Sequence, residues 1–116
     1  MSNITLYHNP RCSKSRQALQ LLQEKGVEPQ LRLYLETPPS RDELVTLLEQ
    51  LAIEPRLLMR KGEQEFKDNN LKDTVLSNDV LIDAMVTYPK LIERPIAIKG
   101  DKAVIGRPPE NVLDLI

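Results

Sequence analysis

The chain has 116 residues, of which 41% are hydrophobic and 28% charged, ordinary proportions for one globular domain. The formal net charge of -1 gives no bulk attraction for a polyanion, so we expect no nucleic-acid partner. A single cysteine excludes an internal disulfide framework and fits a reducing compartment. We find no signal-peptide pattern and no window that could span a membrane, so we expect a cytoplasmic protein without a membrane partner.

The first third of the chain predicts a strand, a helix and a second strand. Residues 4–7 form a short apolar strand pattern. Residues 13–25 predict a helix that stops at Gly26. Residues 30–35 alternate leucines with other residues, which indicates a second strand. The apolar stripe of the helix consists of Ala18, Leu19, Leu21 and Leu22.

The middle of the chain predicts helices. Ser40 and Glu43 form a capping-box pattern at the start of one helix. Residues 55–61 suit a short helix, whereas residues 63–76 are polar and weakly patterned. Ser77 is suited to cap a further helix. The inward positions that we expect on the two longer helices are Leu44, Leu47, Leu48, Leu51, Leu81, Ile82 and Met85.

The last part of the chain predicts a β-hairpin and a helix. Residues 96–98 and 103–105 are apolar strands joined by a turn at Gly100-Asp101. A final helix begins near Pro109, with Val112, Leu113 and Ile116 on its apolar side. The order βαβ, helical block, ββα predicts an α/β chain with a thioredoxin-like fold. We expect one domain over residues 1–116, with a helical insertion at about 40–90.

Cys12 is the residue that points to chemistry. It follows the first strand and lies where the first helix should begin, and Arg11 and Lys14 bring positive charge close to it. Unpaired N–H groups and the helix dipole at such a position favour thiolate over thiol. A buried structural role is the more common fate of a single cysteine. The strand–loop–helix placement and the nearby positive charge favour a reactive thiol here.

The motif around this cysteine is Cys-x-x-Ser, because Ser15 stands where a second cysteine would resolve an oxidised sulfur. If Cys12 turns over, the resolving thiol must therefore come from outside the chain. A small thiol such as glutathione, or a protein such as glutaredoxin, would supply it.

Three arginines and the only histidine are further candidates. Arg94 and Arg107 precede prolines and should be extended, and a thioredoxin-like fold predicts a cis peptide at Arg94-Pro95. Guanidinium groups bind oxyanions through paired donors, which makes Arg60 a third candidate. Surface salt bridges are nevertheless the more common role of an arginine. His8 suits pairing with the thiolate or moving a proton, and it suits equally a hydrogen-bonded role in the loop.

Five motifs together carry a specific resemblance that runs from the first strand to the last helix. They are Tyr7-His8-Asn9-Pro10-x-Cys12-x-x-Ser15-Arg16, Leu33-Tyr34-Leu35-Glu36-Thr37-Pro38, Leu58-Met59-Arg60, Leu91-Ile92-x-Arg94-Pro95-Ile96 and Gly106-Arg107-Pro108. The sequence resembles the glutaredoxin-coupled arsenate reductase family, called ArsC-like, and within it the compact ArsC-related branch.

The resemblance implies an arsenate reductase that uses glutathione as co-substrate and glutaredoxin as partner, with no metal and no bound prosthetic group. Cys12 would attack arsenate or a similar oxyanion and form a thioarsenate adduct, which glutathione and glutaredoxin resolve to arsenite. The implied catalytic residues are Cys12, His8, Ser15 and Arg16, and the implied substrate-binding residues are Arg60, Arg94 and Arg107.

Two other functions remain open at the level of the sequence. The first is a glutathione-linked thiol–disulfide oxidoreductase of unknown substrate on the same scaffold. Ser13-Lys14 follows the cysteine here, where established arsenate reductases of this family commonly have Gly-Thr. The second is a regulator that binds RNA polymerase, as the Spx proteins do, although Ser15 replaces the second cysteine of their redox switch.

Overall fold

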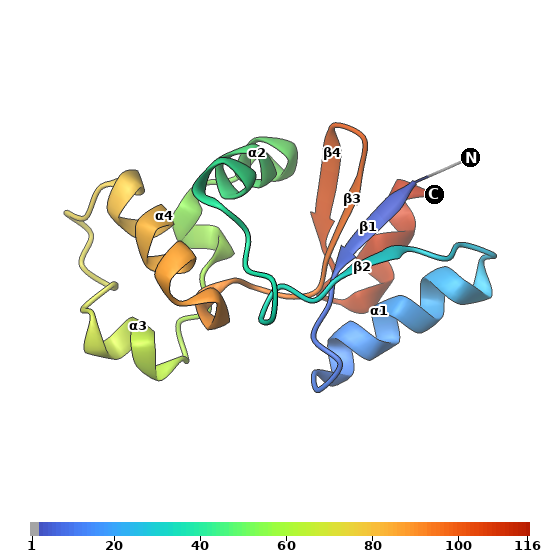
Figure 1. Ribbon diagram of the computed structural model, residues 1–116, viewed down its shortest axis with the longest axis horizontal. Helices are drawn as coiled ribbons and strands as arrows, with labels where there is room; N and C mark the ends of the chain where they lie inside the picture. The colour runs from blue at the N-terminus through green and yellow to red at the C-terminus, as the bar shows by residue number, and fades with distance from the viewer. Residues whose placement is uncertain (1–2) are drawn as a thin grey trace. The chain divides into compact units, whose positions relative to one another are not determined.

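A computed structural model describes residues 3–116 as two compact units (Figure 1). The first, called here the sheet unit, combines residues 3–37 with Arg94–Ile116. The second, the helical unit, is Pro38–Glu93. The helical unit is thus inserted between the two sequence segments that build the sheet.

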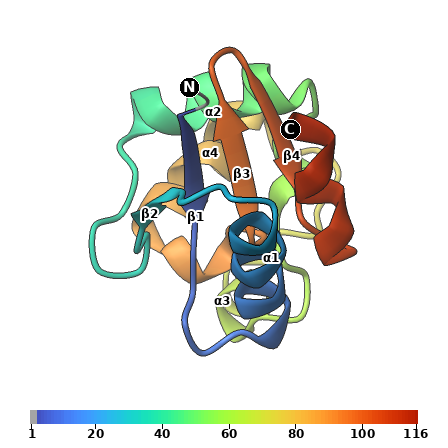
Figure 2. The same ribbon diagram turned by 90° about the vertical axis from the view of Figure 1, so that its right-hand side faces the viewer.

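The sheet unit is built on four strands (Figure 2). These are β1 (Ile4–Tyr7), β2 (Gln30–Arg32), β3 (Ile96–Lys99) and β4 (Lys102–Ile105), in the order β2-β1-β3-β4. β1 pairs parallel with β2 and antiparallel with β3, and β3 pairs antiparallel with β4. With the helix α1 (Ser13–Glu24) between β1 and β2 and the 3₁₀ segment η3 (Pro109–Leu115) after β4, this is the predicted βαβ and ββα arrangement.

The core of the sheet unit explains why these segments fold as they do. Ile4 and Leu6 point to the same face of β1, because side chains alternate along a strand. Ala18 and Leu22 lie one turn apart on α1 and complete the contact with that face. The buried cluster consists of Ile4, Leu6, Ala18, Leu22, Ala97, Val112 and Leu115.

The second strand is shorter than the leucine alternation predicts. β2 ends at Arg32, and the N–H groups of Glu36 and Thr37 both donate to the carbonyl of Leu33 at 2.9 Å, which forms a turn. β2 is an edge strand, and its Leu31 side chain is 44% exposed. The alternation therefore does not mark a buried face, and Tyr34 is the residue of this segment that becomes buried.

The last segment is a 3₁₀ helix rather than an α-helix, and its buried face differs from the predicted one. Val112 and Leu115 are buried, whereas Ile116 is 54% exposed. A 3₁₀ helix has three residues per turn, so positions 112 and 115 fall on one face. The predicted α-helical spacing placed Ile116 there instead, and that prediction was wrong.

The helical unit contains α2 (Arg41–Leu51), η1 (Pro55–Leu58), α3 (Gln64–Asp68), α4 (Asn78–Thr87) and η2 (Pro89–Leu91). The predicted capping box is confirmed, since Glu43 N–H donates to Ser40 Oγ at 3.1 Å and Ser40 N–H to the Glu43 carboxylate at 2.9 Å. Ser77 caps α4 by accepting from Val80 N–H at 3.3 Å. Most of the expected inward positions are buried, namely Leu44, Leu47, Leu48, Leu81, Ile82 and Met85, whereas Leu51 is half-buried.

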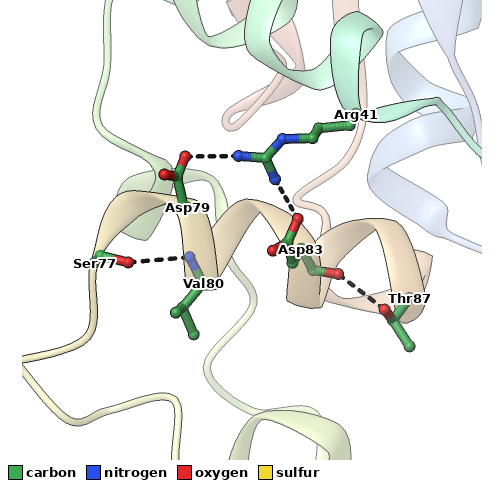
Figure 3. Close-up of polar contacts among 6 residues, drawn as sticks. All are labelled: Arg41, Ser77, Asp79, Val80, Asp83 and Thr87. Atoms are coloured by element: carbon green, nitrogen blue, oxygen red, sulfur yellow. Dashed lines mark hydrogen bonds and ion pairs between the residues drawn. The ribbon is translucent and has the colours of Figure 1, made fainter.

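An arginine links α2 to α4 within this unit (Figure 3). Arg41 donates from Nη2 to Asp79 Oδ1 at 2.6 Å and from Nη1 to Asp83. The carboxylates are largely exposed, so these ion pairs add little to stability. Among residues 3–116, no helix is both long enough and apolar enough to cross a membrane.

Candidate active site

Cys12 occupies the N-cap position of α1, as the sequence predicts. Its N–H donates to the carbonyl of Asn9 at 3.0 Å, and its own carbonyl accepts the N–H of Arg16 at 3.0 Å. Cys12 forms no disulfide, and the residue is only 8% exposed. The sulfur therefore lies at the end of the helix where backbone N–H groups point outward.

The electrostatics of this position favour the thiolate. Burial raises the pKa of the Cys12 thiol, but the backbone N–H groups of Ser15 and Lys14 and the guanidinium groups of Arg94 and Arg107 outweigh it. The net result is a pKa below the usual 9.0. Because the thiolate is the nucleophilic form, this surrounding favours the form of Cys12 that could act as a nucleophile.

Two of the predicted arginines act on the sulfur electrostatically, and one of them also contacts it. Arg107 lies with Nη2 3.7 Å from Cys12 Sγ, and its Nε–H donates to the carbonyl of Arg94 at 2.8 Å. The Nε and Nη1 atoms of Arg94 are buried. A thiolate with two guanidinium groups beside it combines a nucleophile with charges suited to an oxyanion.

Both of these arginines precede cis prolines. The peptide at Arg94-Pro95 is cis, as predicted, and Arg107-Pro108 is cis as well, which the sequence did not indicate. Gly106 supports this region, because its N–H donates to the carbonyl of Pro95 at 2.8 Å. A Cβ at Gly106 would lie 2.8 Å from Pro95 Cγ, so only glycine fits without a shift of its neighbours. Sequence reasoning missed this packing role.

His8 is bonded to Ser15 in the loop before α1. Its Nδ1 lies 2.7 Å from Ser15 Oγ, which also accepts the N–H of Asn9 at 3.0 Å. Burial, followed by the nearby charge of Arg16, lowers the pKa of His8 below 6.5. These two hydrogen bonds fit a neutral imidazole whose Nδ1 accepts a hydrogen bond from the Ser15 hydroxyl group, while the hydroxyl oxygen accepts from Asn9 N–H. The buried side chains of His8 and Ser15 thus brace the loop that carries Cys12.

Arg16 also braces this loop. Its Nη1 donates to the carbonyl of Pro10 at 2.9 Å, which connects the first turn of α1 to the segment before Cys12. The guanidinium is exposed. Arg16 therefore holds the loop that precedes Cys12, and its role in catalysis stays a prediction.

Arg60 belongs to the helical unit. Its Nη1 lies 2.6 Å from Glu63 Oε2 and its Nε 3.9 Å from Glu93 Oε1, while its N–H donates to the carbonyl of Leu91 at 2.7 Å. These contacts fix Arg60 within its own unit. Its role as a third oxyanion ligand stays a prediction.

Cysteine and arginine are thus the chemical groups of this site. In the part of the chain that the structure describes, no three His, Cys, Asp or Glu side chains come together as metal ligands. The sheet topology, the thiol at the start of α1 and the arginines that act on it define the class: a thioredoxin-like protein with a cysteine at the start of its first helix.

Comparison with known proteins identifies the family within this class. The model of the ArsC family matches residues 7–115, and the chain belongs to the ArsC family. It is 54% identical over 114 residues to the Escherichia coli K12 protein named Uncharacterized protein YfgD, covering 97% of this chain and 96% of that protein.

Two further relatives carry a functional name. The Arsenate reductase of Haemophilus influenzae is 45% identical over 115 residues, covering 98% of this chain and 99% of the relative. The solved structure named Arsenate reductase from Vibrio cholerae has a TM-score of 0.96 at 49% identity, with 99% of this chain and 98% of that chain covered.

Proposed function

We propose that this protein is an arsenate reductase in which Cys12 is the nucleophile and glutathione and glutaredoxin supply the electrons. The observation that carries the proposal is the 3.7 Å contact between Arg107 Nη2 and Cys12 Sγ, with Arg94 beside it. This arrangement suits an oxyanion held against a thiolate. Relatives named Arsenate reductase over nearly the whole chain support it.

The first step is substitution at arsenic. The Cys12 thiolate attacks the arsenic atom of the dihydrogen arsenate anion, a sulfur–arsenic bond forms, and hydroxide leaves. Arsenic stays pentavalent in this step. The total charge also stays the same, because the two reactants and the two products, the thioarsenate adduct and hydroxide, each carry one negative charge. Arg94 and Arg107 neutralise the anion that would otherwise repel the thiolate. Arg60 is the third oxyanion ligand in this proposal.

The second stage is the reduction. The thiol of glutathione displaces a hydroxyl group of the adduct, which leaves as water with the thiol proton, and a sulfur–arsenic bond to glutathione forms. A glutaredoxin thiolate then attacks that sulfur, a mixed disulfide forms, and the electron pair stays on arsenic, which becomes trivalent. Water releases arsenite and returns Cys12 as a thiol. The two sulfur atoms that become oxidised belong to glutathione and glutaredoxin, which suits a chain with one cysteine. The proposal also places the protein in a reducing, cytoplasmic setting.

A second candidate function can be separated by the same test. A thiol whose pKa is lowered at a helix start also suits glutathione-linked disulfide exchange on another substrate. Such exchange needs no oxyanion ligands. The two functions therefore respond differently to loss of the arginines.

The test is arsenate-dependent oxidation of NADPH in the presence of glutathione, glutaredoxin and glutathione reductase. We expect activity in the wild type, none in Cys12→Ser, and a loss of about 100-fold in Arg94→Gln, as for removal of one oxyanion donor. Lys102→Gln, which removes an exposed charge on β4, serves as the control. Activity with a mixed disulfide substrate but none with arsenate would replace the first function by the second.

A further inference from the structure

The helical unit contains a basic pocket outside the cysteine site. It has a volume of about 460 Å³, within the range of small-molecule sites. All of its lining residues come from one segment, residues 61–72. They are Lys61, Phe66, Lys67, Asn70 and Lys72.

The lining of this pocket carries positive charge alone. Its three lysines are exposed, and among residues 3–116 no acidic residue lines it. Residues 61–73 also carry four carboxylates, and three of them have other partners: Glu63 pairs with Arg60 at 2.6 Å, Asp68 accepts from Gln64 at 2.8 Å, and Asp73 accepts from the N–H of Val75 at 3.0 Å. The fourth, Glu65, lies on α3 and does not line the pocket. Concentrated positive charge of this kind raises the local concentration of anions.

The pocket is also held in shape. Phe66 is 5% exposed and anchors α3 in the core of the helical unit, which holds the backbone at the adjoining Lys67. The loop after α3 is held by Arg56, which donates to the carbonyl of Leu71 at 2.7 Å and to that of Asp73 at 2.9 Å. Lys72 lies between these two anchored carbonyls. The backbone on both sides of the pocket is thus held by contacts that require no ligand.

We infer that this pocket binds a small anion that carries adjacent phosphoryl groups, of the polyphosphate type. Each ammonium group is a compact charge with three donors, which suits phosphate oxygens that are close to one another. Three such groups favour a ligand with several charges over a single orthophosphate. The volume suits a small molecule, and the overall net charge of -1 speaks against a nucleic-acid surface.

The test is a titration of the ¹⁵N-labelled full chain with inorganic tripolyphosphate, followed by NMR. We expect saturable shifts of backbone amides within residues 61–72, weaker binding of orthophosphate, and weaker binding of both at high salt because free ions screen the charges. The Arg94→Ala variant should retain this binding, which separates the pocket from the arginines at Cys12. Shifts confined to residues around Cys12 would overturn the inference.

A pair of double variants gives the matched comparison. Lys67→Gln with Lys72→Gln should weaken tripolyphosphate binding by about tenfold or more, because two close ammonium groups are lost. Lys90→Gln with Lys102→Gln removes the same net charge from exposed positions outside the pocket and should leave binding nearly unchanged. The NMR spectra report whether each variant folds. Equal weakening in both double variants would show a general charge effect and would overturn the proposed site.

Discussion

Arg107 and Cys12 meet across 95 positions of sequence, with Nη2 of the arginine 3.7 Å from the sulfur. The arginine is held from its other side, because its Nε–H donates to the carbonyl of Arg94. The segment that follows β4 thereby places a guanidinium group at the start of α1. A fixed positive charge at this distance favours the thiolate without movement of the backbone.

The reactivity of Cys12 should depend on both arginines at the sulfur. Arg94→Gln and Arg107→Gln should each raise the pKa of the Cys12 thiol, with the larger effect for Arg94, whose charge lowers that pKa more. The measurement is the pH dependence of the alkylation rate with iodoacetamide. Lys102→Gln is the control, and a midpoint that stays at the wild-type pH in both arginine variants would contradict this account.

The buried Ser15 hydroxyl should stabilise the fold. Ser15→Ala leaves His8 Nδ1 and the N–H of Asn9 without their shared partner, and we expect a loss of about 1–3 kcal/mol in the free energy of unfolding. Urea denaturation measures it. Ser13→Ala, at an exposed position in the same helical turn, should change stability by less than about 0.5 kcal/mol. Equal effects of the two substitutions would argue against the hydrogen-bond network as the cause.

Gly106 should tolerate no side chain. In Gly106→Ala the new Cβ would lie 2.8 Å from Pro95 Cγ and 3.1 Å from Val112 Cγ1, and such crowding costs about 1–3 kcal/mol. Thermal or urea unfolding measures this loss. Gly62→Ala is the matched control, because nothing lies within 4 Å of the Cβ it would add. A wild-type stability for Gly106→Ala would show that the ring of Pro95 moves aside at little cost.

His8 should make the folded state sensitive to acid. Its pKa is lowered below 6.5 in the folded chain by burial and by Arg16, so below pH 6.5 the unfolded chain takes up this proton first. The free energy of unfolding should therefore fall as the pH drops through this window, and no such effect of His8 should be present above it. Comparing wild type with His8→Gln by urea denaturation at pH 5 and pH 7.5 measures the contribution. An equal difference at both pH values would contradict it.

The sequence predicted correctly those helix ends that are capped by residues close to them in the chain. The Ser40–Glu43 capping box and the Ser77 cap are contacts over three residues, so a short sequence window contains both partners. The end of β2 and the 3₁₀ form of Pro109–Leu115 could not be predicted in this way. They depend on which strand lies at the sheet edge and on how the last segment packs against α1 and the sheet.

By itself, the sequence determined the order of strands and helices, the position of Cys12 at the start of α1, and the motif residues that mark the family. Only the tertiary structure decided that Arg107 reaches the sulfur, that His8 is bonded to Ser15, and that Arg16 holds the carbonyl of Pro10. The reason is physical. Helix caps and strand periodicity arise from interactions between near neighbours, whereas a side chain's partner across the fold depends on how β1, β3 and β4 pair and on the turns that follow them.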